Sequence, residues 1–140
     1  MFGRVNFEQG GNRMPSPLRA GDGLVANFLI DNRAAETDET LTVTNVSGGM
    51  IHQGTTLTSD VTYTLPTAAL MVADNSYAAM DIGDAYSFVV NNSQVGAFDV
   101  VIAVGSGMTK VGANNTLSVP PQSSRIFTLI KTAAATFDLY

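Results

Sequence analysis

The stretch RIFTLIK, Arg125 to Lys131, decides the fold class because it is a strand pattern with apolar side chains on both faces. Successive side chains of a strand point to opposite faces, so Ile126 and Ile130 point one way. Phe127 and Leu129 point the other way. An antiparallel strand with one face in water should alternate apolar and polar residues instead. Either this strand is central and covered on both sides by its own domain, or its second face meets another subunit. We favour the second interpretation.

Short strand patterns of the same kind fill the chain on both sides of this stretch. From Gly23 onward, runs of period-two alternation are separated by turn residues, which indicates short antiparallel strands. FDVVIAV also has an excess of apolar residues, with Val101 and Ala103 opposite its main apolar row. The predicted strands are LVANFLI (24–30), LTVTNV (41–46), VTYTL (61–65), AYSFVVN (85–91), FDVVIAV (98–104), NTLSV (115–119), RIFTLIK (125–131) and TFDLY (136–140).

A single helix is predicted within LPTAALMVAD, residues 65–74, where Pro66 suits a first turn and alanine, leucine and methionine follow. The lack of other helices excludes a parallel α/β architecture. Strands spaced by about ten residues with glycine and asparagine turns are typical of sandwiches and barrels. The sequence therefore predicts an all-β fold, an antiparallel β-sandwich or a jelly-roll-like barrel with one short helix.

The first 23 residues differ from the rest and are predicted to form an extended N-terminal arm, ahead of a β-sandwich domain at 24–140. Pro15 and Pro17 forbid a regular helix or a central strand there. Apolar side chains recur along the arm, which suggests burial against its own domain or another chain. The candidate interface with a partner protein or another subunit combines arm residues with the central strand: Phe2, Arg4, Phe7, Arg13, Met14, Leu18, Arg19, Ile126, Phe127 and Leu129.

Charge and composition exclude several function classes. The 140 residues carry a formal net charge of -5 with only seven Lys and Arg, which argues against a nucleic-acid surface because counterion release needs clustered cations. Up to Arg33 four arginines face three acids, whereas the rest has three cations and nine acids. Cysteine is absent, which removes disulfides and thiolate chemistry. The opening MFGRVNFEQGG lacks the pattern of a signal peptide, and no stretch has the length of a membrane span. We expect a product made and used inside the cell.

Candidate catalytic and metal-binding residues are few, and we expect no enzyme activity, cofactor or metal. His52 is the only histidine, and its strand-turn context favours an ordinary surface or core residue over a Ser-His-Asp relay. Asp81, Gly83 and Asp84 could offer oxygens to calcium, but a turn explains them better. The glycines of VGSGMTKVG are interpreted as turns, since no G-K-[ST] follows. Glu36, Asp38 and Glu39 are expected to form a solvated acidic loop.

The order of TLPTAALM, GDAYSFVVNN, VGSGMTKVG, SSRIFTLIKT and TFDLY resembles a β-rich module of tailed-bacteriophage structural proteins, the capsid decoration (cement) proteins and some tail or fibre components. The resemblance covers about Thr64 to Tyr140. It implies a homo-oligomer, a trimer, on the capsid surface of a virion assembled in the bacterial cytoplasm. Its partner would be the major capsid protein, with no direct contact to nucleic acid or membrane.

Two other classes remain open at this point. The first is a phage tail, fibre or receptor-binding module of lectin type, with polar loops around Asn75 to Tyr77, Asn91 to Gln94 and Asn114 to Asn115 as the sugar site. Tryptophan, the most frequent sugar platform, is absent. The second is a small trimeric β-enzyme such as a dUTPase, whose motifs are not found here.

Overall fold

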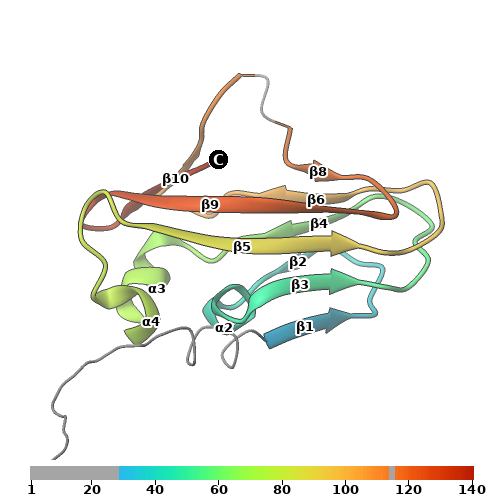
Figure 1. Cartoon of the computed structure of the whole chain (residues 1–140), viewed down its shortest axis with the longest axis horizontal. Coiled ribbons are helices and arrows are strands. Elements are labelled where there is room, and N and C mark those ends of the chain that lie inside the picture. Colours follow the sequence, from blue (N-terminus) through green and yellow to red (C-terminus); the bar gives the residue numbers. More distant parts are fainter. Residues whose placement is uncertain (1–28, 114–115) are drawn as a thin grey trace, which may run out of the picture.

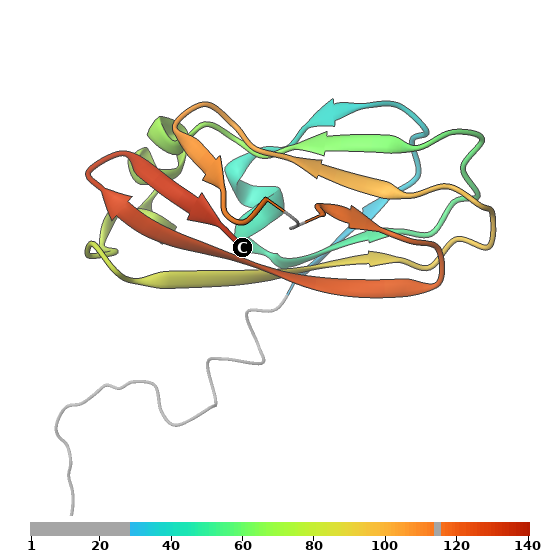
Figure 2. The ribbon, with the colours of Figure 1, turned by 90° about the horizontal axis from the view of Figure 1, so that it is seen from above.

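The computed structural model describes residues 29–113 and 116–140, which form two mixed β-sheets and three short helices. The two sheets lie one in front of the other in Figure 1 and separate into two layers when seen from above in Figure 2. The arm at residues 1–23 lies outside the described residues, as does most of the first predicted strand. The mostly β, sandwich-like architecture that the sequence predicts is confirmed.

The larger sheet has six strands in the order β1-β3-β5-β9-β10-β7. Its strands are β1 (Leu29–Arg33), β3 (Gly49–Gln53), β5 (Ala85–Asn92), β7 (Met108–Lys110), β9 (Ser123–Ala133) and β10 (Thr136–Leu139). The smaller sheet has the order β2-β4-β6-β8. Its strands are β2 (Glu39–Thr40), β4 (Val61–Thr64), β6 (Val100–Ala103) and β8 (Ser118–Val119).

From β1 to β8 the chain changes sheet at every strand, so that it winds as a coil around the space between the layers. Successive turns of the coil stack β1, β3 and β5 in parallel in the larger sheet, and β2, β4 and β6 in parallel in the smaller one. Only the pairs β5/β9, β9/β10 and β6/β8 are antiparallel. The expected antiparallel sandwich is therefore wrong in its strand directions. Crossovers through the opposite sheet replace the helices that parallel strands usually need.

The helices differ from the prediction of one. The expected helix within residues 65–74 is confirmed as α3 (Ala68–Ala73), which Thr67 caps by accepting from the N–H of Leu70. A short α4 (Asn75–Ala78) follows it, and both lie at one end of the sandwich (Figure 1).

The predicted strand 41–46 is wrong, because α2 (Val43–Ser47) occupies most of it. Thr42 accepts from the N–H of Asn45, and the Asn45 side chain accepts from the N–H of Thr42, a reciprocal cap that starts a helix despite the threonines and valines. Two further short strands, β2 and β7, lie where the sequence predicted a solvated acidic loop and turns.

The core lies between the two sheets and is built from the inward positions of nearly every strand. Phe88 of β5 and Phe127 of β9 are opposite each other in register, and their rings stack with centroids 5.6 Å apart. Tyr63 and Ile102 are neighbours in register on the smaller sheet and are fully buried. The turn before β7 needs glycine, because a Cβ on Gly105 would overlap the backbone of Leu65 and Pro66.

Candidate interaction surface

Strand β9 has one buried face and one exposed face. Phe127 and Leu129 point into the core and are 0% exposed. Ile126 points away from the core and is 66% exposed, and Ile130 on the same face is half-buried. Of the two explanations for this strand, coverage on both sides by its own domain does not hold within the described residues.

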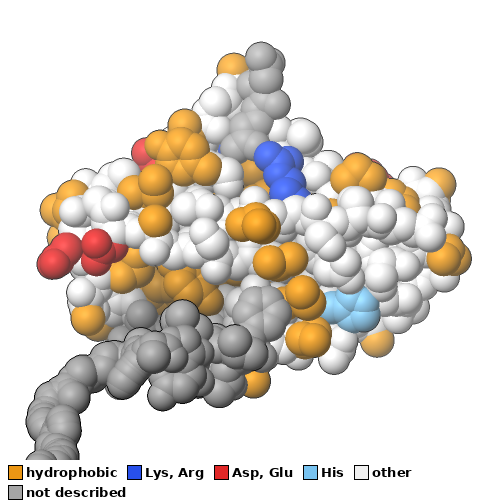
Figure 3. All heavy atoms as spheres, in the orientation of Figure 1, with side chains coloured by type: hydrophobic (Ala, Val, Ile, Leu, Met, Phe, Trp, Pro, Cys, Tyr) orange, Lys and Arg blue, Asp and Glu red, His pale blue; other side chains and the backbone are white. Residues whose placement is uncertain are grey.

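The exposed side chain of Ile126 belongs to a row that crosses the larger sheet. Ile30 of β1 is in register with Met50 of β3, Met50 with Val89 of β5, and Val89 with Ile126. Ile30 is 54% exposed, whereas Met50 and Val89 are half-buried. We call these four residues the apolar row. In Figure 3, which faces this sheet, orange side chains run across β9, β5, β3 and β1 beside the pale blue histidine.

Polar side chains beside the apolar row are paired with one another. On one side, His52 Nδ1 lies 2.7 Å from Asn32 Oδ1, and the Asn91 amide donates to Ser124 Oγ at 2.7 Å. On the other side, the hydroxyls of Ser87 and Thr128 lie 2.8 Å apart. These contacts join neighbouring strands, so the polar groups flanking the row have partners within the sheet itself.

The outward positions of β1, β3, β5 and β9 carry no Asp, Glu, Lys or Arg in the part of the chain that the structure describes. The first charged outward residue reached by register is Asp138 of β10, beside Ile130. A surface without charge on a chain with a net charge of -5 is unusual, since soluble surfaces normally mix charges. The combination of an uncharged face and the apolar row favours contact with another protein surface over contact with water.

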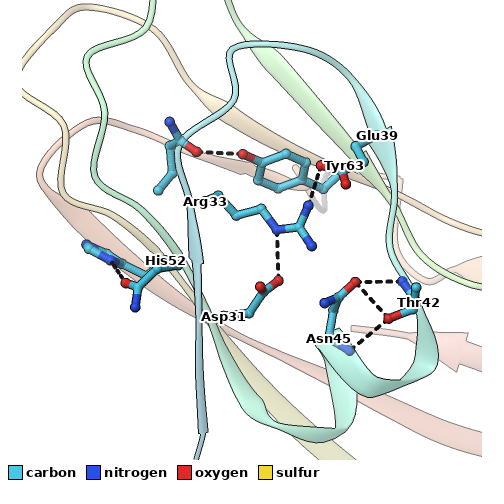
Figure 4. A network of polar contacts seen from close by, with 9 residues as sticks. Asp31, Arg33, Glu39, Thr42, Asn45, His52 and Tyr63 are labelled. Carbon is cyan, nitrogen blue, oxygen red and sulfur yellow. Dashed lines mark hydrogen bonds and ion pairs between the residues drawn. The ribbon is translucent and has the colours of Figure 1, made fainter.

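The charges of the first strands gather at one edge of the sandwich. Arg33 of β1 donates to Asp31 at 2.8 Å and to Glu39 of β2, so it connects the edge strands of the two sheets. Its guanidinium lies 5.5 Å from the ring centroid of Tyr63, whose hydroxyl donates to Gln53 Oε1 at 2.6 Å (Figure 4).

Burial alone would lower the pKa of the Arg33 guanidinium, but its hydrogen bonds to Glu39 and Asp31 and their charges outweigh burial and raise that pKa. The expected solvated acidic loop is therefore tied to the domain. Asp38 accepts from the N–H of Thr62 and Glu36 from the hydroxyl of Thr58, in addition to the Arg33–Glu39 pair. We interpret this cluster as a structural link between the sheets.

His52 lies between Asn32 and Ser93, an arrangement like the Ser-His-Asp triad of hydrolases but with asparagine in place of aspartate. Its Nδ1 contacts Asn32 Oδ1, and its Nε2 lies 2.7 Å from Ser93 Oγ. An amide in place of a carboxylate cannot stabilise an imidazolium as aspartate does. The N–H of Ser93, which could serve an oxyanion, already donates to the Gln53 carbonyl at 3.0 Å. We therefore interpret the contacts of His52 as part of the polar flank of the row.

The structure separates the residues of the predicted interface. Ile126 is on the surface, whereas Phe127 and Leu129 are core residues and are not available to a partner. The reason is the strand period of two, which places neighbours on opposite faces. The remaining predicted contacts, Phe2, Arg4, Phe7, Arg13, Met14, Leu18 and Arg19, lie outside the described residues. Ile30, Met50 and Val89 were missed, because only the strand register shows that they lie beside Ile126.

Other predicted sites receive a structural explanation. The Asp84 carboxylate accepts from the N–H of Asp81, which closes the turn around Gly83. No group of three or more potential metal ligands occurs among residues 29–113 and 116–140. Of the loops considered for sugar, Tyr77 is 0% exposed and Gln94 is buried, whereas residues 114–115 lie outside the described part of the chain.

Comparison with known proteins does not assign a family. No family model matches the chain, and no curated protein and no solved structure matches it significantly. Within the described residues, no helix has both the length and the apolar character needed to cross a membrane.

Proposed function

We propose that this chain is a structural virion protein, a capsid decoration (cement) protein that binds the outer surface of a tailed-phage capsid and stabilises contacts between major capsid proteins. The observation that carries the proposal is the one-sided burial of β9 within an uncharged sheet face. Ile126 is exposed although its neighbours Phe127 and Leu129 are fully buried. An apolar row across four strands with exposed isoleucines at both ends is typical of protein contact surfaces.

The chemistry of the described surface supports a binding role. Outward positions on the larger sheet offer no cluster of cations for phosphate, which argues against nucleic acid as the partner. The N-terminal 33 residues carry the excess of arginine, so we propose that they contact acidic surfaces of the capsid. A homo-oligomer, a trimer in the proposed role, would multiply modest contacts from each copy into firm attachment through effective concentration.

The direct test is binding to expanded, undecorated capsids of a tailed phage that carries this chain. Purified protein is mixed with the capsids at increasing concentration, and bound protein is separated by sedimentation and quantified. We expect saturation at a fixed ratio of protein to capsid hexamers. Capsids that have not expanded serve as the control and should bind much less. The absence of saturable binding at micromolar concentration would reject the proposal.

The contribution of the arm is tested separately by deleting residues 1–20. We expect capsid binding to be lost while the circular dichroism spectrum and thermal transition of the β domain are retained. A deletion variant that binds with unchanged affinity would show that the arm is not a contact. A positive glycan array at low micromolar affinity, together with no capsid binding, would favour a receptor-binding module instead.

A further inference from the structure

We propose that the outer face of the six-stranded sheet, centred on the apolar row, is the contact through which copies of this chain bind one another. Each copy would cover the row of another copy with the same face. The inference rests on the proposed function, because it names the surface through which the proposed homo-oligomer assembles. It concerns Ile30, Met50, Val89 and Ile126, which the strand register brings together.

The first argument is the cost of leaving this face in water. The row places four aliphatic or thioether side chains next to one another on β1, β3, β5 and β9. Parallel strands are normally covered on both faces of their sheet, and three of these four strands run parallel. Among the described residues, the core covers the inner face only.

The second argument is that polar side chains beside the row already form hydrogen bonds with one another within the sheet. Removing a polar group from water is costly when it has no hydrogen-bond partner. Here Asn32 and His52, Asn91 and Ser124, and Ser87 and Thr128 already pair across strands. A second protein surface therefore has to supply fewer donors and acceptors when it covers these groups.

The third argument selects a copy of the same chain as the partner. The outward positions of the four strands are uncharged, so two copies meet without the like-charge repulsion that a net charge of -5 per chain would otherwise cause. A partner selected by opposite charge would find no complementary group here. Sheets also pack well face to face, about 10 Å apart, because their side chains interdigitate. The same face on another copy offers the matching chemistry at equal concentration.

The size of the face indicates a modest affinity. Two outward rows cross all four strands and two more cross only β5 and β9, so twelve positions of about 4.8 by 6.6 Å give roughly 380 Å² of flat area per copy, about 760 Å² for a pair. This lies below the roughly 1,000 Å² typical of a stable specific interface. A two-fold axis pairs the face with itself, whereas a three-fold axis brings three faces together so that each touches its two neighbours with different parts. We therefore expect self-association that depends on concentration in the micromolar range.

The test measures self-association of the full chain and needs no capsid. Sedimentation equilibrium from about 1 µM to about 1 mM should give an average mass that rises from the 14.7 kDa chain mass toward twice or three times that value. A wild-type chain that stays monomeric over this range would overturn the inference. In that case residues 1–28 or a capsid protein would be the cover of the face.

Substitutions locate the contact. Ile126→Asp should weaken self-association at least tenfold, because every contact would then bury a carboxylate from each copy. Ile82→Asp is the matched control, since Ile82 is 69% exposed, close to the 66% of Ile126, but lies in a turn outside the face. It should change the association constant by less than twofold. Equal effects of both variants would overturn the inference.

A second variant guards against a folding defect at Ile126. Ile30→Asp changes the opposite end of the row on a different strand, at a residue that is 54% exposed. It should weaken association to a similar degree while the thermal transition stays that of the wild type. A folded Ile30→Asp chain that associates normally would contradict the proposal. Loss of capsid binding with intact self-association would instead count against the proposed function alone.

Discussion

The two outer faces of the sandwich are built by the same strand geometry but differ in the size of their side chains. On the larger sheet the central row is Ile30, Met50, Val89 and Ile126. On the smaller sheet the outward residues have short side chains: Thr62, Val101 and Ser118 in one row, and Thr40, Thr64 and Ala103 in the next. Neither set contains a charged residue. Absence of charge alone therefore does not mark a contact surface.

The difference in outward side chains shows on which sheet apolar area remains exposed. Threonine suits a strand and offers a hydroxyl to water, so the smaller sheet has a stable wet face. Isoleucine and methionine side chains offer water no strong hydrogen-bonding group, and burying one of them fully contributes about 1.5–3 kcal/mol of stabilising free energy. The larger sheet is therefore the one whose outer face would gain more free energy from being covered by a partner. Denaturation and sedimentation of single-residue variants test this difference.

The largest effect is expected between neighbouring residues of β9. Phe127→Ala removes a fully buried ring that stacks on Phe88, and should lower the free energy of unfolding by about 3–5 kcal/mol. Ile126→Ala, one residue away on the exposed face, should change it by less than about 1 kcal/mol. Urea denaturation of both variants at a concentration where the chain is monomeric provides the measurement. Similar losses would mean that the outer face is covered within the monomer.

The next effect concerns tyrosines in the core. Burial, only partly offset by the Arg33 guanidinium, raises the pKa of Tyr63 to about 12. Above pH of about 10 the unfolded chain ionises this group while the folded chain does not, so stability should fall between pH of about 10 and 12. Burial raises the pKa of Tyr77 and Tyr86 in the same direction. Tyr63→Phe should therefore make the fall smaller without removing it.

Replacing Tyr63 or Tyr77 with phenylalanine gives a comparison at neutral pH. Tyr63→Phe should lower the free energy of unfolding by about 1–2 kcal/mol, since Gln53 loses its 2.6 Å partner. The Tyr77 hydroxyl is buried next to Tyr86 and makes no hydrogen bond of normal geometry among the described residues, so Tyr77→Phe should cost less than Tyr63→Phe. Denaturation curves at pH 7 and pH 11 test both statements. A larger loss for Tyr77→Phe would contradict them.

The smallest effect is expected on the outer face of the smaller sheet. Val101→Asp introduces a charge at an outward, half-buried position of β6. We expect self-association to change by less than twofold, in contrast to at least tenfold for Ile126→Asp. Sedimentation of the two variants under identical conditions makes the comparison. A strong effect of Val101→Asp on self-association would indicate that the copies bind through the smaller sheet, contrary to our proposal.

Local patterns in the sequence were sufficient for much of the fold. The alternation in 61–65 and 85–91 matches β4 and β5, and RIFTLIK lies within β9. The helix at Ala68–Ala73 also followed from its composition. By contrast, the strand expected at 41–46 is helix α2, because the reciprocal cap of Thr42 and Asn45 outweighs the β propensity of valine and threonine.

Strand direction could not be read from period-two alternation, which is identical in parallel and antiparallel sheets. The small number of helices argues against a parallel α/β architecture but does not exclude parallel strands, because here the opposite sheet provides the crossover. The candidate surface was predictable only in part. RIFTLIK indicated that a face near Ile126 remains uncovered, yet the partners of Ile126 in the row come from strands 37 or more residues away in sequence and needed the register.

The winding of the chain between the two sheets also affects how it folds. Strands that pair in one sheet are separated in sequence by strands of the other, as β1 and β3 are by β2 and β5 and β9 are by β6 and β8. Most stabilising pairs therefore close long loops, a topology of high contact order. We expect refolding on the millisecond to second timescale with one cooperative phase, and a correspondingly slow unfolding rate, which would suit a protein that must last without being resynthesised.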